Sequence, residues 1–220
     1  MEVFRRNLEA LIVKEGKDIK AFLSDYGVQR IEQLSLQEID HIAGTFGLSF
    51  ENLLCYPHHS LSGDWPDIKL LILDVDGVMT DGGMYFTENG DQIKKYNTKD
   101  GMAIMKLQDT SVKTGIISSG FKTRLVKDRA DLLKIDLFYV GRDRKIDILH
   151  RWCSDLSITM SEVAMIGDDI NDLDIIQSIG FSACPADAVD IIKKNVDIVL
   201  HKKGGEGCVR EFIDRFILSR

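Results

Sequence analysis

The sequence predicts an α/β protein: a doubly wound, Rossmann-like parallel sheet that follows a small all-α N-terminal domain. Two observations predict this fold. From Ile68 onward, short apolar runs alternate with amphipathic stretches of helical length, which is typical of a parallel sheet covered by helices on both faces. Before that point, apolar residues recur with the helical period and no strand pattern interrupts them. We therefore expect a helical domain over residues 1–58, a linker over 59–67 and the α/β domain over 68–220.

Helices account for the whole N-terminal domain. VFRRNLEALIV places its apolar residues on one helical face, and DIKAFLSDYG follows as a second, short helix. The third helix, SLQEIDHIAGTFG, begins at Ser35, and Glu38 three residues later predicts a capping box. SFENLL is a last helical turn. The linker holds two of the three prolines of the chain within CYPHHSLSGDWPD and has no apolar period.

The α/β domain contains six candidate strands: IKLLILD, VKTGIIS, LFYV, VAMIG, FSA and DIVL. The expected helices are Asp100–Asp109, Lys122–Leu133, Arg144–Ser154, Asn171–Ser178, Ala186–Lys193 and Glu206–Leu218. The segment GMYFTENGDQIKKYN departs from this alternation. Two alternating stretches flank Glu88-Asn89-Gly90 there, which predicts a β-hairpin insertion.

Composition excludes several classes of protein. The net charge of −7 argues against a general nucleic-acid binder. None of the four cysteines forms a C-x-x-C pair, so we expect neither a zinc site nor a disulfide framework, but reduced thiols in a cytoplasmic protein. The first residues lack the apolar core and cleavage site of a signal peptide, and no apolar run is long enough to span a membrane.

Two acidic clusters follow predicted strands. Asp74 and Asp76 come at the end of LLIL, and Asp168, Asp169 and Asp172 follow VAMIG. In a doubly wound sheet such strand ends meet at one edge, where uncompensated carboxylates would repel one another. A hard dication bound by oxygens removes this repulsion, and Mg²⁺ suits a few carboxylates together with a phosphate. A calcium loop is excluded, because Val78 occupies the fifth position of the loop, where an oxygen ligand is needed, and the final glutamate is absent.

Four motifs in order resemble a known enzyme family. DVDGVMTDG and GDDINDL are similar to motifs one and four of the haloacid dehalogenase (HAD) superfamily. NTKDGMAI, GRDRKIDIL and GGEGCVREFIDRFI resemble its capless sugar-acid phosphatases, which include 3-deoxy-D-manno-octulosonate 8-phosphate (KDO 8-phosphate) and nonulosonate 9-phosphate phosphatases. The resemblance covers about residues 67–220. It implies a HAD-type sheet with a hairpin insertion and no large cap, and hydrolysis of a phosphomonoester through an aspartyl phosphate.

The resemblance also implies roles for the first acidic cluster. Asp74 matches the first aspartate of motif one, which is the nucleophile in the family. A carboxylate can attack phosphorus to give an aspartyl phosphate, which splits one displacement into two. Asp76 matches the general acid/base, which protonates the leaving alkoxide and then activates water. Mg²⁺ would be held by Asp74, the backbone carbonyl of Asp76 and Asp168, with Asp169 in the outer shell of that site.

Motifs two and three supply groups for the transferred phosphoryl. The motif-two hydroxyl is Ser118 when counted from the strand and Ser119 when counted back from the next helix, so both remain candidates. Lys145 matches the motif-three lysine, whose ammonium would neutralise charge on the phosphoryl oxygens. Asp172 would hold Lys145 as its ion-pair partner.

A capless enzyme needs another wall for its site. In the similar enzymes, subunits of a tetramer supply it through the hairpin after motif one, here residues 84–96, so the resemblance implies a homotetramer. NTKDG would line the pocket mouth with Asn97, Asp100 and Gly101. The segment GGEG, residues 204–207, resembles a mobile segment that closes over the site.

The expected substrate is a small phosphorylated sugar acid, and Lys122 and Arg129 are candidates to bind its carboxylate. The resemblance places KDO 8-phosphate first as the substrate. Octulosonate enzymes often carry arginine where this chain has Phe121 and Glu206, and this loss of positive charge makes the 9-phosphate of a nonulosonate of the KDN or N-acetylneuraminate type the alternative, in a pathway with a cytidylyltransferase.

The N-terminal helices resemble a phage-repressor-type helix-turn-helix domain over residues 7–54. Residues 1–60 hold six lysines and arginines against nine aspartates and glutamates, and the would-be recognition segment VQRIEQL has Arg30 as its one cation. Because DNA binders need basic groups for phosphates, we expect packing or oligomer contacts rather than DNA binding. The other hypothesis is a regulator whose phosphatase-like domain senses a sugar phosphate; the complete set of Asp74, Asp76, Lys145 and Asp168 favours the enzyme.

Overall fold

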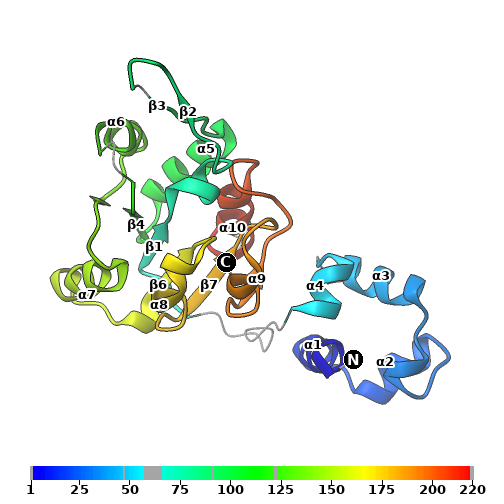
Figure 1. The fold of residues 1–220 in the computed structure, drawn as a ribbon. Helices are drawn as coiled ribbons and strands as arrows, with labels where there is room; N and C mark the ends of the chain where they lie inside the picture. Colours follow the sequence, from blue (N-terminus) through cyan, green and yellow to red (C-terminus); the bar gives the residue numbers. More distant parts are fainter. Residues whose placement is uncertain (1, 47, 57–65, 91, 121–122, 219–220) are drawn as a thin grey trace. The chain divides into compact units, whose positions relative to one another are not determined.

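The protein is described by a computed structural model, which covers residues 2–46, 48–56, 66–90, 92–120 and 123–218 (Figure 1). The chain divides into two compact units. One comprises residues 1–64 with residues 197–199, and the other comprises residues 65–196 and 200–220. Within the described ranges, every helix is too short or too polar to cross a lipid bilayer.

The first unit consists of helices around a core of its own. Its α-helices are α1 (Glu2–Lys14), α2 (Ile19–Asp25), α3 (Leu36–Thr45) and α4 (Phe50–Cys55). Leu8, Ile12, Ile42 and Leu53 are fully buried in the core between them.

The predicted capping box is confirmed at the start of α3. The Ser35 N–H donates to Glu38 Oε2 at 2.7 Å, and the Glu38 N–H donates to Ser35 Oγ at 3.3 Å.

The segment predicted to correspond to a recognition helix forms no α-helix. Only Ile31–Gln33 form a 3₁₀ turn, η1, between α2 and α3. Helix-turn-helix proteins place an α-helix in the major groove, and three residues of 3₁₀ helix offer no comparable face. The geometry therefore adds a second reason, beside the negative charge, to expect no DNA binding by this unit.

The second unit is built on a six-stranded sheet, as predicted (Figure 1). The strands of the sheet are β1 (Leu70–Leu73), β4 (Lys113–Ser118), β5 (Leu137–Val140), β6 (Val163–Ile166) and β7 (Phe181–Cys184), and also β8 (Ile198–Val199), whose residues are grouped with the first unit. They lie in the order β5-β4-β1-β6-β7-β8, and β1 pairs in parallel with both β4 and β6. The chain adds strands first on one side of β1 and then on the other, so the order reverses between β1 and β6. In such sheets ligands bind at this reversal, beyond the carboxyl ends of the strands.

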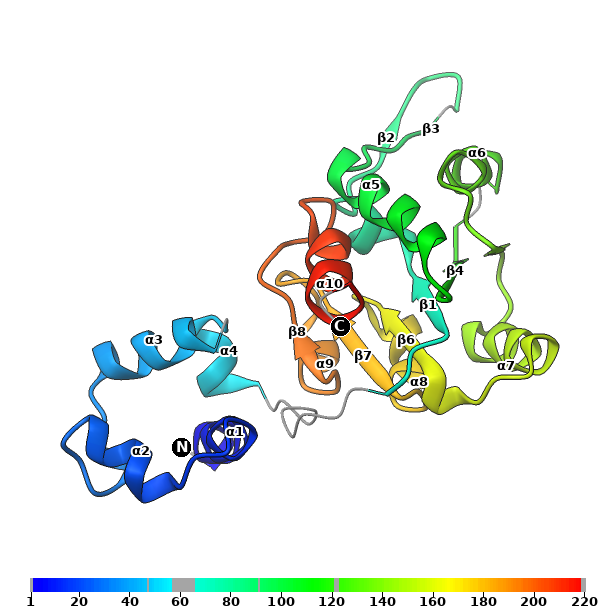
Figure 2. The same cartoon turned by 180° about the vertical axis from the view of Figure 1, so that it is seen from behind.

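Helices cover the two faces of the sheet, as Figures 1 and 2 show from opposite sides. They are α5 (Thr98–Lys106), α6 (Thr123–Leu133), α7 (Lys145–Leu156), α8 (Leu173–Ile176), α9 (Asp190–Lys193) and α10 (Cys208–Phe216). Leu70 and Ile72 share a buried cluster with Leu149 of α7 and Ile175 of α8. Because side chains alternate along a strand, Leu71 and Leu73, also fully buried, face the opposite side.

Two helices near the loop after β6 are shorter than predicted. The helix expected from Asn171 begins as a 3₁₀ turn, η5 (Ile170–Asp172), and α8 follows it. The helix expected from Ala186 begins only at Asp190, because the residue before it forms a backbone hydrogen bond with the loop after β6. There, the Val189 N–H donates to the carbonyl of Asp168 at 3.1 Å. Both departures lie beside the acidic loop after β6, where backbone groups hold that loop in place.

The predicted hairpin is present. β2 (Tyr85–Phe86) and β3 (Gln92–Ile93) pair in antiparallel fashion, with Tyr85 opposite Ile93 and Phe86 opposite Gln92. The hairpin projects from the α/β unit in both views (Figures 1 and 2). Its apolar side chains are exposed: Met84 by 57%, Tyr85 by 62%, Phe86 by 62% and Ile93 by 58%.

The glycine-rich segment before α10 is packed against the loop after β1, and its mobility stays a prediction. The Gly205 N–H donates to the carbonyl of Val78 at 2.9 Å, and the Gly204 N–H donates to Asp187 Oδ1 at 2.9 Å. The side chain of Asn97 donates to the carbonyl of Gly205 at 3.1 Å. A Cβ atom at Gly204 would overlap the carbonyl of Gly77, so this close approach requires glycine.

Gly204→Ala should therefore lower the free energy of unfolding by about 1–3 kcal/mol, because the added methyl group forces the two loops apart. Gly44→Ala is the matched control. Gly44 lies in α3 with open space where its Cβ would be, so alanine should raise the free energy of unfolding by about 0.5–1 kcal/mol. Urea denaturation of the two variants measures both changes. A Gly204→Ala variant as stable as the wild type would show that the two loops separate freely.

Candidate active site

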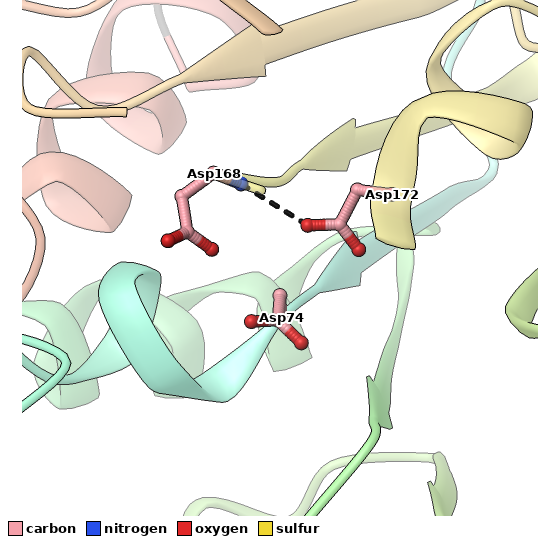
Figure 3. A group of neighbouring side chains, drawn as sticks. All are labelled: Asp74, Asp168 and Asp172. Atoms are coloured by element: carbon pink, nitrogen blue, oxygen red, sulfur yellow. Dashed lines mark hydrogen bonds between the residues drawn. The ribbon is translucent and has the colours of Figure 1, made fainter. Parts of the chain in front are cut away.

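The acidic clusters meet at the carboxyl ends of two adjacent strands. Leu73 of β1 lies opposite Ile166 of β6, so Asp74 and Asp168 leave the sheet side by side. Asp172 approaches from η5. Figure 3 shows the three carboxylates gathered around one centre, and carboxylate oxygens from all three lie within 4.8 Å of one another. This convergence is the one that the spacing of the acidic residues predicts.

A wide turn after β1 makes room for the second cluster. Residues Val75–Met79 form this turn, and Gly77 adopts a left-handed conformation with φ of 95°. A Cβ atom at this glycine would overlap the carboxylate of Asp168. Thr80 closes the turn, since its hydroxyl donates to the carbonyl of Val75 at 3.2 Å. Glycine at position 77 is therefore required both by the backbone conformation and by the close approach of Asp168.

Lys145 joins the two clusters. It is the first residue of α7, and its side chain is only 3% exposed. Its ammonium donates to Asp74 Oδ1 and to Asp172 Oδ1, each at 2.6 Å. The ion pair between Lys145 and Asp172 that the sequence predicts is thus present. Burial by itself would lower the pKa of Lys145, but the two carboxylates outweigh it and raise the pKa above the usual range of lysine, which keeps the ammonium charged.

Asp172 is fully engaged with the protein. One oxygen accepts from Lys145, and the other accepts from the backbone N–H of Asp168 at 3.1 Å, the bond drawn in Figure 3. It therefore orients Lys145 and the loop after β6 at the same time. Asp169 is exposed, and its carboxylate accepts from the N–H of Ile170 at 2.7 Å.

Asp74 and Asp168 carry more negative charge than their surroundings offset. Burial, and then neighbouring carboxylates, raise the pKa of Asp74 to about 7 and that of Asp168 to about 8, although Lys145 acts in the opposite direction. Asp168 Oδ1 is buried and finds no hydrogen-bond partner in the described parts of the chain. Two crowded carboxylates, one with an oxygen lacking a partner, fit a hard divalent cation such as Mg²⁺.

A cavity of about 250 Å³ opens above these carboxylates. Both candidate serines line it. Ser118 ends β4 and is 2% exposed, and its hydroxyl accepts from the N–H of Gly120 at 3.3 Å. Ser119 is exposed and accepts from the side chain of Asn171 at 3.2 Å. The other residues around the cavity are Asp74, Asp76, Met84, Gln92, Lys94, Val126, Asp168 and Asp169.

Comparison with known proteins identifies this arrangement. A family model described as haloacid dehalogenase-like hydrolase matches residues 142–213. A 3-deoxy-D-manno-octulosonate 8-phosphate phosphatase of Salmonella typhi is 37% identical over 154 residues, which are 70% of this chain and 81% of that protein. The chain belongs to this family of HAD phosphatases.

Solved structures of the family share its fold. The 3-deoxy-D-manno-octulosonate 8-phosphate phosphatase of Yersinia pestis is 36% identical, with a TM-score of 0.67 over 70% of this chain and 83% of that one. The enzyme of Moraxella catarrhalis, solved in complex with a magnesium ion, a phosphate ion and KDO, is 29% identical, with a TM-score of 0.67 over 70% of this chain and 88% of that one. The predicted family, fold and phosphatase class are confirmed.

Four of the predicted substrate-binding residues of this phosphatase are not among the described residues that line the cavity: Asn97, Asp100, Gly101 and Arg129. Asn97 caps α5, where its side-chain oxygen accepts from the N–H of Lys99 at 2.8 Å. Asp100 is buried and accepts from the N–H of Arg210 in the first turn of α10 at 2.7 Å. Lys122 lies outside the described residues. In this chain, Asn97 and Asp100 instead stabilise the starts of two helices.

Arg129 and Gly101 likewise join helices rather than face the cavity. The guanidinium of Arg129 lies 5.1 Å from the ring centre of Tyr96 and donates to the carbonyl of Asn97 at 3.4 Å. A Cβ atom at Gly101 would press on this guanidinium, so the glycine leaves room for α6 against α5. The side chains of Asn97, Asp100 and Arg129 thus make contacts within the protein, and Gly101 leaves room for Arg129, so binding of substrate by these four residues stays a prediction.

Sequence reasoning missed Lys94, which lines the cavity and forms an ion pair with Asp76. A signal was present in the alternation of the hairpin. Gln92, Lys94 and Tyr96 are partly buried, whereas Ile93 and Lys95 between them are exposed, which is the period of two expected for an extended chain. That period, followed from the partly buried Tyr96, points Lys94 inward.

Mg²⁺ should stabilise the enzyme more at about pH 8 than at about pH 5.5. Unfolded aspartates release their protons near pH 4, whereas Asp74 and Asp168 in the folded protein hold theirs to about 7 and about 8. In this window the folded state binds more protons, so without metal its free energy of unfolding falls as pH rises. A bound dication favours the ionised carboxylates and offsets this loss.

Thermal unfolding with EDTA or Mg²⁺ at the two pH values measures the effect. Asp168→Asn should raise the melting temperature of the metal-free enzyme at the higher pH and should abolish the response to Mg²⁺. An equal response to Mg²⁺ at both pH values, or one that survives in Asp168→Asn, would contradict the assignment of the cation to these carboxylates.

Proposed function

We propose that this phosphatase is a Mg²⁺-dependent enzyme that hydrolyses a phosphorylated sugar acid, in the first place KDO 8-phosphate, through an aspartyl phosphate on Asp74. One observation carries the proposal: Asp74 stands at the end of β1, bound to Lys145 and beside Asp168, at the base of an open cavity. Relatives named for KDO 8-phosphate, one of them solved with KDO and magnesium, support the substrate.

In the proposed first step, an Asp74 oxygen attacks phosphorus while the bond from phosphorus to the sugar oxygen breaks. Lys145 holds the other oxygen of Asp74 in place and offsets charge on the phosphoryl oxygens. Asp76 gives its proton to the departing alkoxide. In the second step, Asp76 takes a proton from water, whose oxygen attacks phosphorus and releases Asp74 and inorganic phosphate.

The proposed ligands of Mg²⁺ are Asp74, Asp168 and the backbone carbonyl of Asp76. When bound, the cation would draw electron density from the phosphoryl group and offset its charge. Asp172 is better suited to orient Lys145, because both of its oxygens already accept hydrogen bonds. Asp169 remains proposed for the outer shell. Ser118 and Ser119 both remain candidates to donate to the transferred phosphoryl.

A nonulosonate 9-phosphate is the second candidate substrate. Glu206, exposed before α10, carries a negative charge where the similar octulosonate enzymes often carry arginine. A sensor of sugar phosphates without catalysis is disfavoured, since such a protein has no need for a nucleophile held by a buried lysine. A cytoplasmic location stays a prediction from the cysteines.

Release of inorganic phosphate with Mg²⁺ from KDO 8-phosphate, KDN 9-phosphate and N-acetylneuraminate 9-phosphate tests the proposal. One of them should be turned over, and Asp74→Asn should lower kcat by about 10³-fold or more, because no nucleophile remains. Asp155→Asn, an exposed carboxylate on α7, is the control and should leave kcat unchanged. If the wild type hydrolyses none of the three, nor an aryl phosphate, the catalytic proposal fails.

We also propose that the hairpin packs against other subunits in a homotetramer. Exposed apolar side chains in a cluster usually mark an interface, and Met84, Tyr85, Phe86 and Ile93 are all more than half exposed.

Light scattering coupled to gel filtration should give the mass of four chains. The double variant Tyr85→Lys/Phe86→Lys should dissociate, because lysines cannot be desolvated in an apolar contact without a large cost. Ile191→Lys, which changes an exposed isoleucine on α9, should leave the assembly intact. A wild-type monomer would exclude this interface.

A further inference from the structure

Lys94 is enclosed in a part of the hairpin where its neighbours are exposed. The side chain of Lys94 is 5% exposed, whereas Ile93 is 58% exposed and the side chain of Lys95 is 69% exposed. Successive side chains of an extended chain point to opposite sides. Lys94 therefore turns away from the exposed face of the hairpin and into the active-site cavity, which it lines.

The ammonium of Lys94 forms an ion pair with the carboxylate of Asp76. Among the described residues around the cavity, Lys94 is the one with a positive charge, and it faces the carboxylates of Asp74, Asp76, Asp168 and Asp169. Enclosing an ammonium is costly unless a partner of opposite charge accepts its hydrogen bonds. Of these four carboxylates, the one that pairs with Lys94 is Asp76.

Asp76 needs such a partner to have a defined position. It lies in the turn after β1, where its own dihedrals (φ −84°, ψ 110°) are not helical, and its side chain is 33% exposed at the edge of the cavity. Lys94 is the only side chain in the described structure that forms a hydrogen bond with this carboxylate. A short side chain at an open edge otherwise samples several rotamers, so the ammonium selects one of them.

We propose that Lys94 is a positioning residue, which holds the carboxyl group of Asp76 where it passes a proton to the leaving group and later takes one from water. The inference rests on the function proposed above. It adds that the catalytic position of Asp76 is set by the hairpin, some twenty residues further along the chain. The role concerns proton transfer only, and Lys94 itself forms and breaks no covalent bond.

Leaving-group chemistry separates this role from a structural one. A sugar alkoxide is a poor leaving group and must be protonated as it departs, whereas 4-nitrophenolate departs without a proton. The ratio kcat/KM reports only the steps up to departure of the leaving group. A misplaced Asp76 should therefore lower kcat/KM for alkyl phosphates and spare kcat/KM for an aryl phosphate.

The experiment compares Lys94→Met, Lys94→Arg and Lys95→Met with the wild type in the presence of Mg²⁺. The substrates are the best of the three sugar-acid phosphates, glucose 6-phosphate as an alkyl phosphate without a carboxylate, and 4-nitrophenyl phosphate. Methionine keeps the length of the side chain and removes its charge. Lys95 is the matched control, since it is exposed on the same strand end, 3.5 Å from Asp81.

Lys94→Met should lower kcat/KM for both alkyl phosphates by about 10²-fold and change that of 4-nitrophenyl phosphate by less than about threefold. With the aryl phosphate it should produce a burst of nitrophenolate, because water attack on the aspartyl phosphate becomes slow. Lys94→Arg should restore most of the loss, and Lys95→Met should match the wild type.

Two results would overturn the role of Lys94 while leaving the phosphatase proposal intact. An equal loss with alkyl and aryl phosphates, or no loss at all, would show that Lys94 does not act through Asp76. A loss confined to KM for the sugar acid and absent for glucose 6-phosphate would show that Lys94 binds the substrate carboxylate instead. A wild type inactive on every substrate would contradict the proposed function itself.

Discussion

The buried ammonium of Lys145, held between Asp74 and Asp172, is the interaction on which the rest of the site depends. It joins the end of β1, the start of α7 and the turn η5 through two bonds of 2.6 Å. Removing one member of such a buried group leaves an uncompensated charge, at a typical cost of about 3–5 kcal/mol. Because three elements meet at one ammonium, the position of the candidate nucleophile is set by the fold of the whole unit.

Close packing of the loops at the carboxyl ends of the strands requires glycine at positions 77 and 204. Gly77 admits the carboxylate of Asp168, and Gly204 admits the turn that contains Gly77. Carboxylates are thereby brought closer than their charges favour, which raises the pKa of Asp74 and of Asp168. Such crowding destabilises the protein without metal and would favour a bound cation.

The residues predicted for the site show which positions a sequence pattern can locate and which side-chain directions it cannot. Asp74, Asp168 and Lys145 could be predicted, because each follows a strand or begins a helix whose position in a doubly wound sheet is known in advance. Asn97, Asp100 and Arg129 lie in the predicted neighbourhood, yet their side chains cap helices or pack against Tyr96. Their hydrogen-bonding capacity is the same in both roles, and only the direction of each side chain distinguishes them.

The sequence by itself determined the fold class, the six strands, the hairpin and the set of acidic residues at the strand ends, because periodicity and strand order are local properties that add up to one topology. Tertiary structure alone decided several further contacts. It pairs Lys94 with Asp76, packs the glycine-rich segment against the turn after β1, and leaves one 3₁₀ turn where a recognition helix was considered. The first two contacts join segments that are separated in the chain, and no local pattern contains the distances between such segments.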